Sequence, residues 1–150
     1  MVNTNSEKHT FFQRIVVSVD GSESSNRAVE KAVYLSKNTH IPLSAVYVID
    51  MNIYSKTLTS DQFSEQLKSV LTNEGESVLK KTQNLASEHD ISVETKLLDG
   101  DPGEKIIEIT DENDLIILGS KGKNAVDRIF IGSVSEYVLH HADSAVMIVR

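Results

Sequence analysis

Five short runs of apolar, often β-branched residues are spaced along the chain. They lie at residues 14–19, Leu43–Ile49, residues 91–98, residues 115–118 and Ala145–Val149. Between them, apolar residues recur every three or four positions, the spacing of one helix face, within residues 28–36, 63–85, 106–109 and 134–139. Strands that alternate with helices are typical of βαβ units. The pattern therefore predicts one α/β domain, a doubly wound five-stranded parallel sheet with helices on both faces.

The third run differs from the others because its apolar positions alternate with Ser92, Glu94 and Lys96. The other four runs are apolar at nearly every position, as in strands that helices cover on both sides. A strand with one polar face fits the edge of a sheet, so we expect the strand order 3-2-1-4-5. We expect residues 1–10 to form a flexible leader and residues 11–150 to form the domain.

Three local signals refine the helix boundaries. Residues 101–104 (Asp-Pro-Gly-Glu) combine a capping residue with proline at the first helical position, which predicts a helix start. Residues 133–136 (Ser-Val-Ser-Glu) have a capping-box pattern, with Ser133 as the expected N-cap. Gly75 lies within the longest helical stripe and argues against one unbroken helix there.

Composition excludes several classes of protein. The 150 residues include no Cys, which excludes disulfide scaffolds, thiol catalysis, Cys-ligated zinc and iron–sulfur clusters. The formal net charge of −7 disfavours binding to DNA or RNA. No apolar run approaches the roughly 18 residues of a membrane span, and residues 1–10 lack the apolar centre of a signal peptide. We therefore expect a cytoplasmic protein with no membrane partner.

The residues that follow the first and fourth strands are the first candidates for a site. In an open α/β sheet, ligands bind beyond the carboxyl ends of the strands where the strand order reverses, here between strands one and four. Strand one is followed by Asp20-Gly21-Ser22, and strand four by Gly119-Ser120-Lys121-Gly122. After nine intervening residues, Gly132-Ser133 opens the last helix, whose N–H groups suit an anion. The loop also carries Lys121, Lys123 and Arg128. Its chemistry favours a polyphosphate.

Other interpretations of these residues need no ligand. Glycine is common in strand–helix loops, and Ser133 could simply cap its helix. Asp20 could cap a helix that starts near Ser24. Four of the five His fall at predicted helix C-termini and one lies in the leader, so we expect none to be catalytic: His9, His40, His89, His140 and His141.

The spacing Gly-x-x-Gly, nine residues, Gly-Ser resembles the nucleotide signature of the ATP-binding universal stress proteins. The resemblance covers residues 15–22, the second strand with its end Val48-Ile49-Asp50, and residues 114–150. Residues 51–88 add only the expected length and helical character. The resemblance implies a fold like that of the adenine-nucleotide α-hydrolases.

It also implies a role for each matching residue. Asp20 would bind the ribose hydroxyls, Val48 the adenine edge through its backbone, and Leu118 would pack near the base and ribose. The ribose and phosphates would lie among Gly119, Gly122, Gly132, Ser133 and Val134. The same loops add Ser120, Lys121, Lys123 and Ser135 to the predicted nucleotide site. Ser18 belongs to it as well, although some nucleotide-binding relatives carry proline there.

The resemblance further implies Mg²⁺ or Mn²⁺ held by the phosphates, with no metal ligand from protein side chains. The nucleotide would be ATP, with AMP or ADP as alternatives. Family members also dimerise through the final strand, so we expect a homodimer through Ala145–Val149, an apolar strand at a sheet edge.

Taken together, these features predict an ATP-binding, nucleotide-dependent stress-response or regulatory factor. We expect no catalytic residues and at most weak ATP hydrolysis, because no base for an attacking water stands out. A slow ATP hydrolase is one alternative. A phospho-receiver domain is a less favoured one: Asp20, Asp99 and Ser120 match it, but the acidic pair after strand one and the Lys after strand five are missing. The motifs of P-loop and dinucleotide-binding proteins are missing as well.

Overall fold

The computed structural model describes residues 12–54, 60–122 and 130–150. The described elements, in chain order, are β1 (Arg14–Ser18), α1 (Glu23–Thr39), β2 (Leu43–Ile49), the 3₁₀-helix η1 (Asn52–Tyr54), α2 (Asp61–Glu88), β3 (Val93–Asp99), α3 (Pro102–Glu108), β4 (Asp114–Gly119), α4 (Ser133–His141) and β5 (Ala145–Val149). The predicted leader, residues 1–10, lies outside the described residues, as do Lys123 and Arg128. Among the described residues, no helix is both long enough and apolar enough to span a bilayer.

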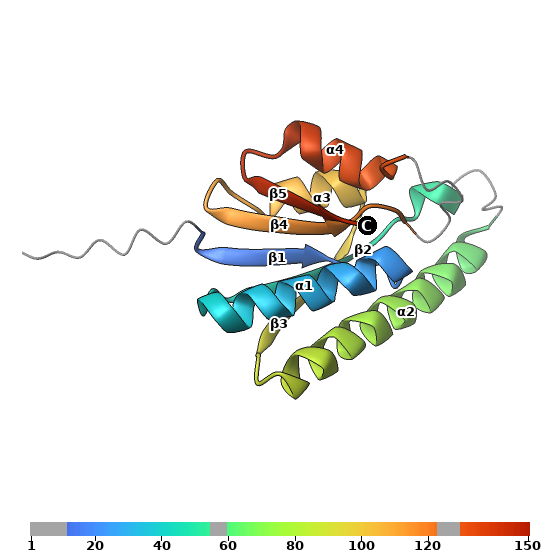
Figure 1. The fold of residues 1–150 in the computed structure, drawn as a ribbon. Helices are drawn as coiled ribbons and strands as arrows, with labels where there is room; N and C mark the ends of the chain where they lie inside the picture. Colours follow the sequence, from blue (N-terminus) through green and yellow to red (C-terminus); the bar gives the residue numbers. More distant parts are fainter. Residues whose placement is uncertain (1–11, 55–59, 123–129) are drawn as a thin grey trace, which may run out of the picture.

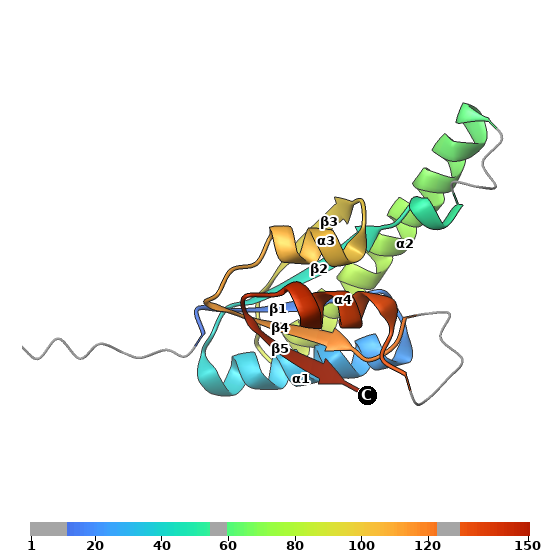
Figure 2. The ribbon, with the colours of Figure 1, turned by 90° about the horizontal axis from the view of Figure 1, so that it is seen from above.

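The strands form one parallel sheet of order β3-β2-β1-β4-β5, so the predicted order and both predicted edge strands are confirmed. Helices α1 and α2 cover one face of the sheet, and α3 and α4 cover the other (Figures 1 and 2). Strand β1 lies at the centre, between β2 and β4. The sequence pattern alone therefore located the sheet, its two layers of helices and its edges.

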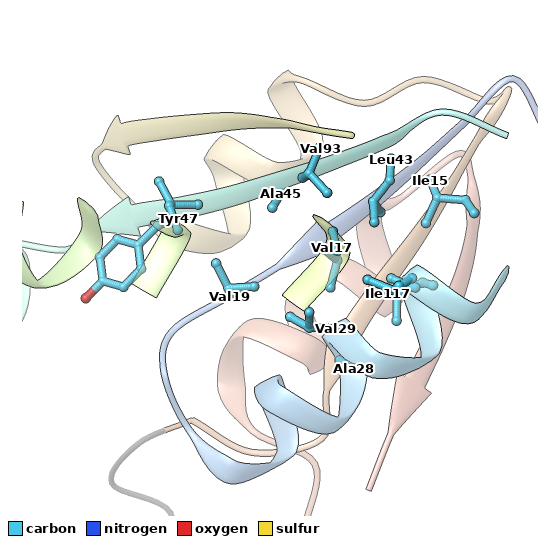
Figure 3. Close-up of a cluster of buried hydrophobic side chains, with 14 of the residues drawn as sticks. Ile15, Val17, Val19, Ala28, Val29, Leu43, Ala45, Tyr47, Val93 and Ile117 are labelled. Carbon is cyan, nitrogen blue, oxygen red and sulfur yellow. The ribbon is translucent and has the colours of Figure 1, made fainter. Parts of the chain in front are cut away.

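Successive residues of the central strands point into two separate cores. Ile15 and Val17 face α1 and α2, in a cluster that also holds Ala28 and Leu79 (Figure 3). Val16 faces the opposite way, into a smaller cluster with Ile106 and Val138 of α3 and α4. Both sides of β1 are thus buried in apolar contacts, which accounts for its unbroken run of β-branched residues.

Helix α2 is continuous through Gly75, although the low helix propensity of glycine argued against one unbroken helix there. Gly75 is buried, and a Cβ atom there would lie 2.7 Å from side-chain atoms of both Tyr47 and Leu97. Glycine lets the helix approach β2 and β3 more closely than any larger residue would. This contact offsets the roughly 1 kcal/mol by which glycine weakens a helix.

The predicted start of α3 is confirmed, because Asp101 is the N-cap and its Oδ1 accepts a hydrogen bond from the Glu104 amide at 3.0 Å. Strand β3 begins at Val93, two residues later than expected. The amide of Ile91 donates instead to the Ala86 carbonyl, 2.9 Å away, and completes the turn after α2. The four His in the described residues lie at helix C-termini as predicted: His40, His89, His140 and His141.

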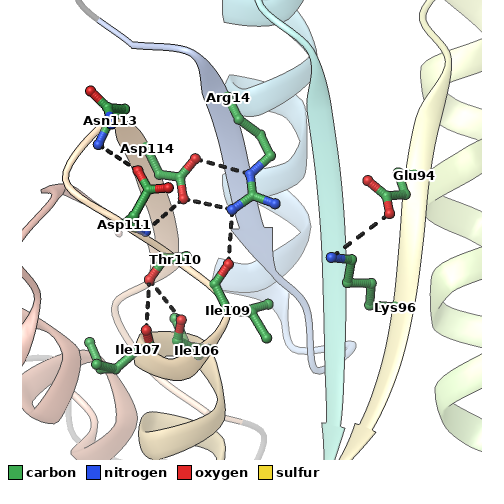
Figure 4. A network of polar contacts seen from close by, with 10 residues as sticks. All are labelled: Arg14, Glu94, Lys96, Ile106, Ile107, Ile109, Thr110, Asp111, Asn113 and Asp114. Atoms are coloured by element: carbon green, nitrogen blue, oxygen red, sulfur yellow. Dashed lines mark hydrogen bonds and ion pairs between the residues drawn. The ribbon is translucent and has the colours of Figure 1, made fainter.

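A partly buried ion pair joins β1 to β4 at the amino edge of the sheet (Figure 4). Arg14 donates from Nε to Asp114 Oδ1 at 2.9 Å and from Nη2 to Oδ2 at 2.7 Å, and the Asp114 side chain is only 4% exposed. Arg14 also donates to the Ile109 carbonyl, and the Asp111 amide donates to Asp114. Burial acts to raise the pKa of Asp114, but the bonds from Arg14 and the Asp111 amide outweigh it and lower this pKa.

We expect Asp114→Asn to lower the free energy of unfolding at pH 7 by about 2–3 kcal/mol, because Arg14 and the Asp111 amide lose a buried charged acceptor. Since folding lowers the pKa of Asp114, its contribution is present above the ordinary value of 3.8 and is lost as the pH falls through the folded pKa. Urea unfolding at several pH values measures both effects. Glu23→Gln, which removes the exposed Glu23–Arg27 pair, is the control and should change stability little. Equal losses in the two variants, or a difference that does not shrink as the pH falls below 3.8, would contradict this account.

Candidate functional site

The loops that follow β1 and β4 meet at the carboxyl edge of the sheet. The two strands are direct neighbours, with Val17 paired in register with Ile117. Beyond them, a Cβ atom built on Gly122 would lie 3.5 Å from Oδ2 of Asp20. The structure therefore brings the predicted carboxylate and the predicted glycine loop together, although 102 positions separate them in the sequence.

The start of α1 holds the loop after β4 in place. The hydroxyls of Ser22 and Ser24 both donate to the carbonyl of Lys121, at 3.2 and 2.7 Å, and the Lys121 amide donates back to the Ser24 hydroxyl at 3.2 Å. The sequence analysis missed these positioning contacts. In the sequence, the only feature that points to these contacts is the cluster of serines after Asp20, and such a cluster is equally typical of ordinary helix capping.

Asp20 belongs to the loop after β1 and faces the loop after β4. Its Oδ1 accepts a hydrogen bond from the Ser22 amide at 2.9 Å, and its own amide donates to the Ser25 hydroxyl at 3.1 Å. The N-cap of α1 is Ser22, whose hydroxyl accepts from the Ser25 amide, so the alternative in which Asp20 caps this helix was wrong. The turn at Gly21 has φ of 80°, which favours glycine. One carboxylate oxygen thus orders the turn, and the other faces Gly122.

The charge of Asp20 also affects the pKa of a residue on the neighbouring strand β2. Burial raises the pKa of Tyr47 on β2, and the negative charge of Asp20 raises it further. Tyr47 therefore stays neutral at physiological pH beside the site. Asp20 itself is only partly buried, so its carboxylate remains accessible from the carboxyl edge.

The last helix begins one residue earlier than expected. Gly132, with φ of −65° and ψ of 157°, is the N-cap of α4, and no side chain caps the helix, so the predicted capping box at Ser133 was wrong. The Gly132 amide donates to the Ser120 carbonyl at 2.6 Å, and the first intrahelical bond joins the Glu136 amide to the Gly132 carbonyl. The amides of residues 133–135 therefore have no acceptor within the helix. They form a group of N–H donors at the positive end of the helix dipole.

The three glycines of the motif are there for different reasons. A Cβ atom on Gly119 would lie 2.6 Å from the Ser24 hydroxyl and the Ser25 amide, so the packing of α1 requires glycine there. Gly122 and Gly132 have no positive φ. A Cβ atom on Gly132 would approach no neighbour closer than 3.4 Å. The described part of the protein does not require glycine at these two positions, but a ligand that closely approaches the backbone would.

The remaining predicted residues line the same edge or support it. Ser18 is the partly buried end of β1, Val48 is partly buried near the end of β2, and Leu118 is 3% exposed in the core beneath α3 and α4. Ser120 and Ser135 are buried. The Ser135 hydroxyl donates to the Gly119 carbonyl at 2.7 Å, which leaves its backbone amide as the group it can offer a ligand.

The edge therefore places helix N–H donors, a carboxylate acceptor and two glycines without side chains within one small region. Lys123 and Arg128, the other predicted cations of the loop, fall in the part of the chain that is not described. Within residues 12–54, 60–122 and 130–150, no group of three His, Asp or Glu side chains is placed to hold a metal ion.

Relatives of this chain share nearly its whole length. A universal stress protein of Methanocaldococcus jannaschii is 32% identical over 141 residues, covering 93% of this chain and 82% of the relative. A putative universal stress protein of Staphylococcus saprophyticus is 37% identical over 144 residues, covering 93% and 84%. Among solved structures, universal stress protein UspA from Lactobacillus plantarum matches with a TM-score of 0.77 and 25% identity, over 93% of this chain and 98% of that one.

Two further structures share the fold at lower identity, and both were determined with a nucleotide. One is a universal stress protein in complex with cAMP, with a TM-score of 0.66 and 22% identity. The other is the universal stress protein from Archaeoglobus fulgidus in complex with dAMP, with a TM-score of 0.64 and 20% identity. Each covers 93% of this chain.

The model of the universal stress protein family matches residues 11–150. This match, the relatives and the sheet order agree, and the chain belongs to the universal stress protein family.

Proposed function

We propose that this protein binds an adenine nucleotide, with ATP as the main ligand, at the carboxyl edge between β1 and β4. The observation that carries the proposal is the pair Gly122 and Gly132, where the described residues do not require glycine, beside the uncapped start of α4 and the Asp20 carboxylate. Unpaired helix amides are a general site for phosphate. An ionised carboxylate with a free oxygen is a good acceptor for ribose hydroxyls.

In this arrangement the phosphates lie over the amides of residues 133–135 and between Gly122 and Gly132. The ribose lies beside Asp20, and the base lies toward Ser18, Val48 and Leu118. Mg²⁺ or Mn²⁺ is held by the phosphates. The cAMP and dAMP complexes of structures with the same fold support an adenine nucleotide and leave AMP and ADP as alternatives to ATP.

The proposed role is that of a cytoplasmic stress-response factor regulated by nucleotide occupancy. Family membership supports a stress-related role. The absence of Cys fits a reducing compartment, where disulfides would be of no use. The nucleotide acts as a regulatory ligand, because the residues described around α4 hold phosphate by backbone amides, which bind an anion but do not activate a water molecule.

We expect Gly132→Asp to abolish ATP binding, because it places a carboxylate where phosphate oxygens approach the start of α4. The backbone angles of Gly132 suit any residue, and among the described residues a Cβ atom meets no contact closer than 3.4 Å, so the variant should fold. Calorimetric titration with ATP and Mg²⁺ measures the affinity, which should be micromolar in the wild type. Ser92→Asp adds the same charge at an exposed position of the opposite edge and is the matched control. Wild-type affinity in the Gly132 variant would overturn the phosphate site.

Hydrolysis of ATP, where it occurs, should be far slower than the roughly 1–1,000 per second of typical enzymes. One Asp20 oxygen is already engaged by the Ser22 amide, and the geometry favours a ribose contact over the activation of water. A single-turnover assay with protein in excess over ATP measures phosphate release directly. Release within seconds would show that the protein is an ATPase.

We also propose that two copies pair through β5. Strand β5 lies at the edge of the sheet, and its side chains are exposed or only partly buried, with Met147 36% exposed. The Val149 carbonyl accepts a bond from the Ser120 amide, so it points toward the loop after β4. Because backbone groups alternate along a strand, those of Val146 and Ile148 point to the free edge. This edge has neither a charge nor a proline to prevent pairing.

We expect Val146→Pro to convert the dimer into a monomer without breaking the β4–β5 ladder, because it removes a donor only from the free edge. Sedimentation equilibrium reports the mass, and circular dichroism checks that the helices persist. Val146→Thr keeps the donor and the branched shape, so it should dimerise like the wild type. If the proline variant dimerises normally, or the wild type stays monomeric at high concentration, the contact lies elsewhere.

A further inference from the structure

A groove runs between α1 and α2 on the face of the sheet opposite α3 and α4. Its wider part is a cavity of about 460 Å³ that begins at Gly21 and is floored by Val29 and Val78. A second cavity of about 230 Å³ continues it past Val33. Both cavities are lined by Glu30 and Leu85, so they lie next to each other, and together they are called the α1–α2 groove. Figure 1 shows α1 and α2 next to each other on this face of the sheet.

The dimensions of the groove suit a helix better than a compact ligand. Along α1 it extends from Asn26 to Lys37, which is about 16 Å at 1.5 Å per residue, or roughly three helical turns. The floor is apolar and the rim is polar, as in the grooves that receive amphipathic helices. Tyr34 stands on the rim with 65% of its surface exposed, and an exposed aromatic ring is a common anchor for a partner.

The charges on the rim differ between its two ends. Glu74 lies toward the end near Gly21, Glu30 and Lys81 line the middle, and Lys37 and His89 line the far end. The rim therefore carries the Glu74 carboxylate toward the carboxyl edge of the sheet and the Lys37 ammonium toward the opposite end. Helices usually carry acidic residues in the first turn and basic residues in the last, because these charges complement the helix dipole. Such a helix fits the groove with its first turn over Lys37.

That orientation is also antiparallel to the two helices that form the walls. Both α1 and α2 return from the carboxyl edge to the amino edge of a parallel sheet, so their dipoles point the same way. A third helix that runs in the opposite direction places its positive end by their negative ends.

We propose that the α1–α2 groove is a docking site for an amphipathic helix of a partner protein, about three turns long, acidic at its N-terminal end and basic at its C-terminal end. Its apolar side chains pack on Val78, Leu85 and Tyr34. The groove lies on α1 and α2, away from the β5 edge, so a β5 dimer leaves it open. The site does not depend on nucleotide binding.

The probe is a displayed library of random 14-residue peptides, selected on the immobilised wild-type protein without nucleotide. The best peptide is then synthesised and titrated into labelled protein, with amide NMR shifts and circular dichroism of the peptide as readouts. We expect enriched peptides with apolar residues every three or four positions, acidic residues first and basic residues last. They should become helical on binding and shift the amides of residues 26–37 and 74–89.

Three variants test the site. Tyr34→Glu and Lys37→Glu should weaken binding at least fivefold, because one places a charge at the anchor and the other reverses the basic end. Lys31→Glu makes the same charge change on the same helix outside the groove, so its affinity should match the wild type. Circular dichroism checks that each variant is folded.

The proposal is overturned if no peptide is enriched, if the shifts map to β5 or to the loop after β4, or if Lys37→Glu and Lys31→Glu behave alike. It is also overturned if small-molecule fragments shift the groove amides while no peptide does, since the groove would then be a ligand cavity.

Discussion

The position of β1, between β2 on one side and β4 on the other, is the constraint on which the rest of the site depends. The chain leaves β1 to form α1 on one face of the sheet, and it leaves β4 toward α4 on the other face. The two departing loops diverge, and a crevice opens at the carboxyl edge. The hydroxyls of Ser22 and Ser24 then fix its width by holding the Lys121 carbonyl. Without these hydrogen bonds, the distance between Asp20 and Gly122 would not be fixed.

The glycines of the motif have two different roles, one in packing and one proposed in ligand binding. Gly119 belongs to the scaffold, because the backbone of α1 fills the space where its side chain would be. Gly75 has the same role against β2 and β3. No described residue packs closely enough against Gly122 or Gly132 to require glycine there. Because these residues have no side chain, a ligand can approach their backbone. The three glycines look equivalent in the sequence, but one is a packing position and two are candidate positions for contact with a ligand.

Much of the fold could be predicted because it follows from burial. Runs such as Leu43–Ile49 are apolar throughout, since both faces of a central parallel strand are covered, and the polar alternation of β3 marks an edge. The helix is continuous at Gly75 despite its low helix propensity, because propensity is local while the contact of Gly75 with Tyr47 and Leu97 is tertiary. The capping box at Ser133 failed for a similar reason: the Gly132 amide bonds to the Ser120 carbonyl, and this tertiary bond sets where α4 begins.

For the candidate site, the sequence located both loops but not the contacts that join them. The serines of α1 gave no distinctive signal, and the groove between α1 and α2 depends on how two helices separated in sequence lie on the sheet. The family resemblance supplied the roles of Asp20, Val48 and Leu118, and these roles remain predictions. Geometry adds that Oδ2 of Asp20 faces Gly122 and that α4 has no side-chain cap.

The central claim is that a nucleotide binds at this edge, and an amide NMR titration of the labelled protein with AMP tests it most directly. The account predicts saturable shifts at residues 20–22, at Gly122 and at residues 132–135. The amides of residues 30–37 and 81–89, along the α1–α2 groove, should not move. A titration that leaves the edge unchanged, or that shifts the groove alone, would contradict the account.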